Sequence, residues 1–431
     1  MRAVLMSFRS DCVHACAVFG CLIGFLITMP GISFAAGALP NAQSKGEWRG
    51  EFAPEFTAFA HSGVAGQASE SLSASLRLEG WYSPDDGRNT FAFVPFVRWD
   101  QRDPERSHHD IRELSWVHVS GSREIRAGWR QVFWGVTEGI HLVDIVNQTD
   151  AIESVDGEQK LGQPMLSLGI ERGDQMLDLF WLVGSRERTF PGREGRLRLP
   201  LVVDSDFARW ESSKGRDRQD LAFRWQWNPY PLRLGVTGFS GTAREPELQP
   251  VLTGKGVVLA PYYPVIQQLG VDVQVTQGDL LWKLEAIQRN GGQRNYHAAD
   301  AGLEYTQVGV FATQADLGWL LEWLYDSRNR KAATPFQRDL LLGWRVAFND
   351  VASSSLLFYV IFDPDDGEQL WSLEAQRRLA EDWQLALEIR QVAGTAAPQS
   401  EAEFLVAPDL THALRPLAHD NFARVTLSWF F

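Results

Sequence analysis

Apolar and polar side chains alternate along most of the chain. Leu72, Ala74 and Leu76, for example, alternate with Ser73 and Ser75. Because successive side chains of a β-strand point to opposite faces, this period of two predicts strands with one apolar and one polar face. The same pattern recurs in segments at 48–60, 90–100, 124–130, 166–171, 177–186, 220–227, 271–276, 317–325, 342–348, 383–389 and 422–431.

The connections between these segments alternate between short turns and long polar loops. This alternation is typical of outer-membrane barrels, which have short periplasmic turns and longer external loops. The sequence therefore predicts an all-β, transmembrane, antiparallel up-and-down β-barrel of about 18 strands. Sixteen strands is the alternative, because residues 300–311 and 353–362 are ambiguous. The expected long loops cover 132–163, 187–217, 241–262, 289–298, 326–337 and 394–419.

The last ten residues form the clearest single segment, with Trp429 and Phe431 on its apolar face. The run FARVTLSWFF resembles the closing strand of bacterial outer-membrane β-barrels, whose terminal Phe serves as an assembly signal. The resemblance implies that Trp429 and Phe431 are read by the barrel-assembly machinery, and that lipid and lipopolysaccharide surround the barrel. The alternative is a buried edge strand of a soluble β protein.

The N-terminus indicates the compartment. Arg2 and Arg9 precede an apolar run at about 15–29, and small residues such as Ala35 and Ala38 follow. This is the pattern of a secretory signal peptide, which we place at 1–35, with a single barrel domain at 36–431 in the bacterial outer membrane. A lone membrane anchor is the alternative.

The composition argues against several classes of protein. Cys12, Cys16 and Cys21 are the only cysteines and all lie in the leader, so the mature chain would have no disulfide, zinc ribbon or thiol chemistry. The formal net charge of -13, which becomes -14 without Arg2, Arg9 and Asp11, argues against nucleic acid as a partner. Seventeen Trp and 25 Phe beside a mean hydropathy of -0.20 suit a barrel better than a helical membrane protein.

The polar face of the strands carries both signs of charge. If the apolar faces meet lipid, Arg98, Glu124, Arg126 and Arg130 line the lumen. Other charged residues on the same face include Glu285, Glu322 and Arg424. Walls of mixed charge keep a pore hydrated and favour polar or zwitterionic solutes over ions of one sign. The alternative is that these charges pair with neighbours and only stiffen the barrel.

A sequence motif lies where the strand pattern ends near Trp134. Its residues are Gly128, Gln131, Trp134 and Gly135, then Asp144 and Asn147. The motif resembles a signature of porin-like outer-membrane families of uncharacterised function and, more loosely, polysaccharide-export barrels. Those families commonly have Pro after the Asn, where this chain has Gln148.

The segment from Trp134 to Gln163 is too long for a hairpin turn and mixes apolar residues with acids. Exposing its apolar residues outside the cell would leave an apolar patch in water, so we expect it to enter the barrel and narrow it. In that arrangement Asp144 and Asp150 would face Arg126 and Arg130 across a constriction. The alternative is a structural corner around Trp134.

Catalytic patterns are weak. His108 and His109 are adjacent and lack metal-ligand spacing, while Ser115 and His118 lie on opposite faces of one strand. We therefore expect no enzyme, no cofactor and no metal. The expected function is a porin-like channel for passive passage of a small polar or amphipathic solute; the alternative is an outer-membrane component of lipid or polysaccharide export or envelope assembly.

Overall fold

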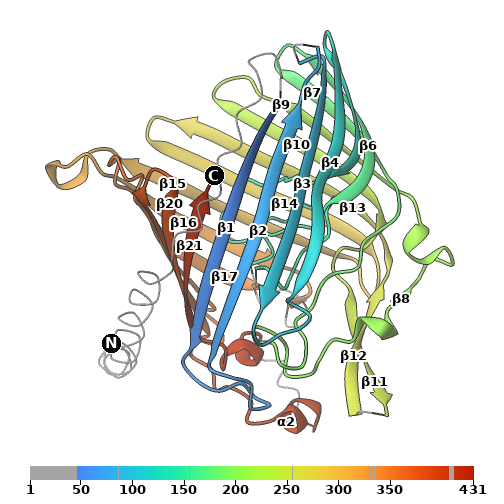
Figure 1. Ribbon diagram of the computed structural model, residues 1–431, viewed down its shortest axis with the longest axis vertical. Coiled ribbons are helices and arrows are strands. Elements are labelled where there is room, and N and C mark those ends of the chain that lie inside the picture. Colours follow the sequence, from blue (N-terminus) through green and yellow to red (C-terminus); the bar gives the residue numbers. More distant parts are fainter. Residues whose placement is uncertain are drawn as a thin grey trace. The chain divides into compact units, whose positions relative to one another are not determined.

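Eighteen antiparallel strands close into one β-barrel in the computed structural model (Figure 1). The structure describes residues 46–85, 87–154, 156–254, 256–329, 332, 336–406 and 412–431. The expected signal peptide, 1–35, lies outside these residues and stays a prediction. Residues Gly46–Phe431 form one compact unit.

The barrel strands follow one another around the ring in chain order. They are β1 (Gly46–Phe59), β2 (Glu70–Tyr82), β3 (Asn89–Asp100), β4 (His108–Ser120), β5 (Arg123–Arg130), β6 (Gln163–Arg172), β7 (Gln175–Leu182), β9 (Asp220–Trp227), β10 (Leu232–Thr242), β13 (Val265–Gln277), β14 (Leu280–Gly291), β15 (Tyr296–Gln307), β16 (Asp316–Asp326), β17 (Arg338–Ala347), β18 (Ser355–Phe362), β19 (Gln369–Ala380), β20 (Trp383–Ala393) and β21 (Phe422–Phe430). Outside the barrel sheet are β8 (Arg209–Trp210), β11 (Glu247–Thr253), β12 (Gly256–Tyr263) and the helix α2 (Glu401–Val406).

Pairing of the first and last strands completes the ring, which leaves no barrel edge unpaired in lipid. Phe52 of β1 lies opposite Trp429 of β21, and Thr57 lies opposite Arg424. The predicted architecture and the count of 18 strands are confirmed, and the alternative of 16 is wrong. Both ambiguous segments are strands, β15 and β18.

The carboxyl end of the chain is held against β1. The backbone N–H of Gly50 donates to the Phe431 carbonyl at 2.7 Å, and the N–H of Phe431 donates back at 3.0 Å. A Cβ added at Gly50 would stand 2.2 Å from the Phe431 ring, so glycine at this position makes room for the terminal aromatic. Trp429 packs against the same ring, with centroids 4.9 Å apart.

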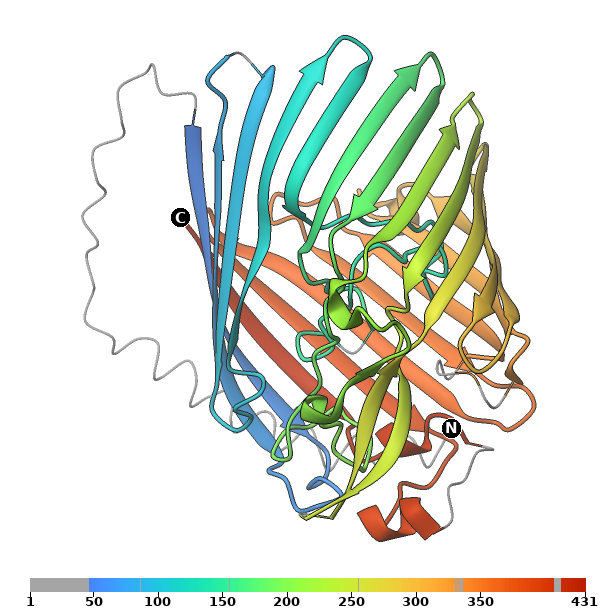
Figure 2. The same cartoon turned by 90° about the vertical axis from the view of Figure 1, so that its right-hand side faces the viewer.

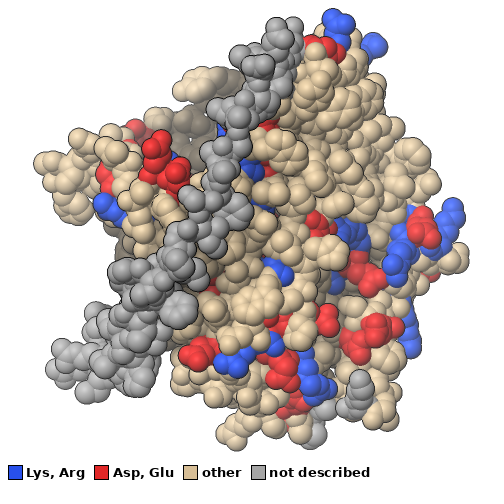
Figure 3. Space-filling view, in the orientation of Figure 1, with Lys and Arg blue, Asp and Glu red and all other residues tan. Residues whose placement is uncertain are grey.

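The two faces of the barrel wall differ as the alternation predicted. Large apolar side chains on the strands are exposed, including Trp99, Trp181 and Leu221, whereas Ser73, Arg98 and Glu285 on the other face are buried. Part of the outer wall in Figure 3 is correspondingly almost free of charged atoms. Stacked or edge-on rings run across neighbouring strands β16 to β19: Trp319, Trp344, Phe358 and Trp371. A row of aromatic residues across neighbouring strands is typical of the border of a membrane-spanning band.

Short turns gather at one end of the barrel and long loops at the other (Figure 2). One expected long loop is wrong: β14 and β15 pair as far as Arg289 and Tyr296, so only residues 292–295 connect them. Another, at 241–262, contains the β11–β12 hairpin. The described residues contain no helix that is long and apolar enough to cross a membrane.

Candidate functional site: the occupied lumen

Loop 131–162, which joins β5 to β6, is bound to the inner wall of the barrel (Figure 2). Glu285 on β14 is fully buried and accepts four hydrogen bonds from it. One carboxylate oxygen accepts from the N–H of Val136 at 2.6 Å and from the N–H and hydroxyl of Thr137 at 3.2 and 3.0 Å. The other accepts from the N–H of Val143 at 3.1 Å. The loop therefore lies inside the ring of strands, as its pattern predicted.

A second carboxylate holds the tip of the same loop. Glu322 on β16, which is 1% exposed, accepts from the N–H of Glu138 at 2.8 Å and from the N–H of Gly139 at 2.7 Å. Arg345 on β17 pairs with the Glu138 side chain. Buried carboxylates that accept backbone N–H bonds satisfy groups that would otherwise be unpaired away from water. Together, Glu285 and Glu322 fix the loop tip, residues 136–143, to the wall.

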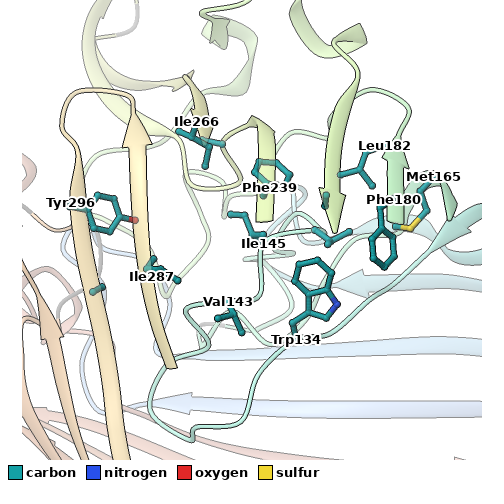
Figure 4. Close-up of a cluster of buried hydrophobic side chains, with 14 residues drawn as sticks. Trp134, Val143, Ile145, Met165, Phe180, Leu182, Phe239, Ile266, Ile287 and Tyr296 are labelled. Atoms are coloured by element: carbon teal, nitrogen blue, oxygen red, sulfur yellow. The ribbon is translucent and has the colours of Figure 1, made fainter. Parts of the chain in front are cut away.

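An apolar cluster fixes the rest of the loop (Figure 4). Trp134, Val143 and Ile145 of the loop are at most 4% exposed. They pack against side chains from β6, β7, β9, β10, β13, β14 and β15; Trp134, for instance, meets Phe180 edge-on at 5.6 Å. Burying side chains of this size contributes about 1.5–3 kcal/mol each. The loop is therefore a packed part of the barrel interior.

Asp150 fixes the returning half of the loop. Its carboxylate accepts from Arg112 on β4 at 2.6 Å and from the hydroxyl of Thr189 at 2.7 Å, and it lies 3.5 Å from the His108 ring nitrogen. Burial acts to raise the pKa of Asp150, but the bond to His108 and the charge of Arg112 outweigh it and lower this pKa to about 2. Asp150 thus remains ionised over the physiological range.

Asp144 has a different environment. Its carboxylate pairs with Lys160 within the loop at 3.1 Å and accepts from the N–H of Trp134 at 3.3 Å. Burial raises the pKa of Asp144, and Lys160 opposes that shift. Asp144 thereby joins the two ends of the loop to each other.

The expected partners of these acids are wrong. Arg126 pairs with Glu124 on its own strand, and Arg130 donates to the Ser167 hydroxyl at 2.9 Å. The reason is the direction of the loop: after Trp134 it crosses to β14 and β16 before it returns, so Asp150 meets β4. The Arg130 carbonyl accepts from the amide of Asn147, the Asn of the motif, at 2.8 Å.

Arg98 belongs to a buried charge cluster, which we define as Glu55, Arg98, Arg106, Glu153 and Arg424. Arg98 donates to both oxygens of Glu153 at 2.7 and 2.8 Å, and Arg106 donates to Glu55 at 2.9 Å. Arg424 lies 3.4 Å from Glu55. Every side chain in the charge cluster is at most 12% exposed, so its charges interact without full screening by water.

Sequence reasoning found Arg98 and Arg424 on the inward face but missed their partners as site residues. Glu55 could have been found, because it alternates with apolar residues on its strand. Arg106 and Glu153 lie in loops, where no periodicity shows which way a side chain points. Glu285 and Glu322 read as ordinary inward acids, and only the loop reveals their function.

Two cavities lined by described residues lie beside the docked loop, along one side of the lumen. The larger, about 660 Å³, lies toward the short-turn end and is lined by residues such as Glu51, Arg77 and Thr426. The smaller, about 50 Å³, lies toward the long-loop end and is lined by residues such as Phe59 and Arg196. The residues common to both linings are Glu153, Ser154 and Arg424. The charge cluster therefore lies between the two cavities, with Glu153 and Arg424 lining both.

No protein-family model and no curated protein matches the chain. Solved structures do. One is Wzi of Escherichia coli, described as an outer-membrane protein involved in group 1 capsule assembly and a carbohydrate-binding β-barrel. The TM-score is 0.52 and the identity 10%, over 89% of this chain and 84% of Wzi. A mutant of the Rh. blastica porin matches with a TM-score of 0.42 and 10% identity, over 90% of this chain and 100% of the porin.

The fold is that of an outer-membrane β-barrel. At 10% identity the likeness to Wzi extends to the fold alone. Within the described residues, no three His, Cys, Asp or Glu side chains are grouped so that they could hold a metal ion.

Proposed function

We propose that the protein is a channel of the bacterial outer membrane for small polar or zwitterionic solutes. Its apolar, aromatic-rich exterior supports a location in lipid, and its charged interior supports a hydrated lumen. In this proposal loop 131–162 narrows the lumen, and the charge cluster forms the constriction. The proposal assigns no catalytic step.

The observation that carries the proposal is the pair of cavities that share Glu153, Ser154 and Arg424. In this proposal they form a route between the docked loop and the wall formed by β1 to β4 and β17 to β21. The larger cavity, about 660 Å³, has room for a solute together with bound water. The smaller cavity, about 50 Å³, limits what passes.

The chemistry of the constriction supports a dipolar solute. Arg98 and Arg106 pair with Glu55 and Glu153, so both signs of charge border the junction side by side. A solute that carries both charges can interact with both kinds of side chain. A bare ion of either sign is attracted by one kind and repelled by the other, and gains less.

Single-channel conductance in a planar bilayer tests the proposal. We expect discrete conductance steps from the refolded barrel, and a shift toward anion selectivity in Glu153→Gln, because that variant removes a negative charge from the constriction. Glu171→Gln is the matched control, since that side chain is exposed and lines neither cavity. The channel is refuted if neither the folded wild type nor any folded variant conducts above the leak of the bare bilayer.

The second candidate is a component of lipid or polysaccharide export or envelope assembly. The extent to which loop 131–162 fills the lumen favours it, and the larger cavity would then hold a saccharide. We distinguish the two by binding: neutral oligosaccharide that binds a non-conducting barrel, with loss of binding when the larger cavity is altered at Arg77, supports this candidate.

A further inference from the structure

A segment of the loop between β7 and β9, residues 191–198, crosses the long-loop rim above the smaller cavity. We call it the strap. Pro191, Gly195, Arg196 and Leu197 of the strap line that cavity together with Arg424. The strap therefore lies at the outer end of the route described above.

Arg196 joins the strap to two other parts of the rim. Its guanidinium donates to the Asp420 carboxylate at 2.7 Å and to the carbonyl of Ala68 at 2.8 Å. It also donates to the carbonyls of His61 at 3.0 Å and His419 at 2.9 Å. The Arg196 side chain is 7% exposed, so these bonds form away from bulk water. One side chain thus connects the β1–β2 loop, the strap and the β20–β21 loop.

The strap backbone is held in a conformation that is costly for its sequence. Leu197 has a φ of 59°, in the left-handed region that non-glycine residues seldom adopt. Its N–H donates to the second oxygen of Asp420 at 2.7 Å, so the same carboxylate that binds Arg196 also holds the strained residue. Strain of this kind persists only when surrounding contacts enforce it. Loss of the Asp420 contacts would therefore favour release of the strap.

The other end of the strap is fixed separately. Asp103 accepts from the N–H of Gly192 at 3.0 Å, and a Cβ at Gly195 would stand 2.2 Å from the same carboxylate. The strap thus has a fixed end at Asp103, and at its other end the Asp420 carboxylate binds both Arg196 and Leu197, beside the three carbonyls that Arg196 also binds.

We propose that the strap is an outer gate of the channel, closed by the contacts of Arg196 and Leu197 with Asp420. The inference rests on the proposed function, because it assigns a gate to the same route. When the Asp420 contacts break, the strap turns about its fixed end at Asp103 and uncovers the smaller cavity. The charge cluster below it is unchanged in both states.

The test compares Arg196→Ala and Asp420→Asn with the wild type in planar bilayers. We expect open probability to rise at least about tenfold in each variant, because each loses charge-assisted hydrogen bonds that hold the closed state. Arg193→Ala is the matched control: it removes an exposed cation of the same strap and should leave gating unchanged. Heat-modifiable migration checks that each barrel is folded.

A reversible lock provides a second test. The cysteines of the sequence are Cys12, Cys16 and Cys21, so a Leu197→Cys, Asp420→Cys pair introduces new thiols at the contact itself. We expect the oxidised form, in which a disulfide holds the strap, to be closed. The reduced form should open more often than the wild type, because it has neither the disulfide nor the Asp420 carboxylate to hold the strap.

The outcomes separate the gate from the channel. Suppose that the wild type conducts and that Glu153→Gln changes its ion selectivity, but that the strap variants and the disulfide-locked variant have the open probability of the wild type. The gate is then refuted and the channel stands. If the wild type is silent and the released variants conduct, both hold. If no folded variant conducts, both are refuted.

Discussion

Replacing both Glu285 and Glu322 with Gln should free the loop tip from the wall. Each Gln keeps one acceptor oxygen but presents an N–H₂ group where a carboxylate oxygen accepted backbone N–H groups, as Glu285 does from Val136 and Thr137. A hydrogen bond to a charged group contributes about 1.5–3 kcal/mol, so the two substitutions together remove roughly 3–6 kcal/mol of docking free energy.

The apolar cluster limits how far the loop moves. Trp134 and Ile145 remain buried in the double variant, and Asp150 still binds Arg112. We therefore expect residues 136–141 of the tip to lift from β14 and β16, while Val143 and the remainder of the loop stay in place. Because about 1.4 kcal/mol corresponds to a tenfold change in an equilibrium, the ratio of docked to free tip should fall at least about a hundredfold.

Conductance and limited proteolysis measure this change together. The double variant should show larger conductance steps and a new cleavage site at the tip, whereas Glu304→Gln, which alters an inward acid paired with Lys283, should show neither. Unchanged conductance and unchanged proteolysis in a folded double variant would mean that the two carboxylates do not hold the loop, and the docking argument would be wrong.

Three further predictions concern the whole barrel and the loop. Deleting Phe431, or replacing Trp429 and Phe431 with Asp, should leave unfolded, protease-sensitive protein in the periplasm; normal heat-modifiable protein in the outer membrane would contradict this. Deleting 138–158 should raise conductance and change ion selectivity, and a folded deletion variant with neither effect would place the loop outside the permeation path. Because the pKa of Asp150 is lowered to about 2, the charge of Asp150 stabilises the docked loop at pH values above the ordinary Asp pKa of about 4. This contribution to the docking free energy, about 2 kcal/mol, is lost as the pH falls toward 2. Proteolysis between pH 5 and pH 2.5 should show the loss, and Asp150→Asn should lack this pH dependence.

The barrel could be predicted because its information is local. A period of two in one segment, such as Leu72 to Leu76, already determines a strand with an outer and an inner face. Turn residues then fix which segments are neighbours. Where the local pattern was weak, as near Arg289 and Tyr296, the expected loop proved to be paired strand.

The site could be predicted only in part, because its contacts are not local. The pattern placed loop 131–162 inside the barrel, but the bonds from the loop to Glu285 and Glu322 join residues more than 140 positions apart. Nothing along the chain specifies that Asp150 meets Arg112 rather than Arg130. Such pairs are set by the path of the loop across the closed ring, which a single sequence does not show.

The composition of the apolar cluster also bears on the order of assembly. The cluster draws Trp134, Val143 and Ile145 together with strands that all lie between β6 and β15, whereas closure joins β1 to β21, more than 360 residues apart in the chain. Contacts at that separation form slowly, because a long stretch of chain must first be brought together. The middle strands can therefore curl around the loop as an open, half-built sheet, and the first and last strands meet afterwards. Loop 131–162 then packs against the middle strands while the barrel is still open. It does not have to enter a barrel that has already closed.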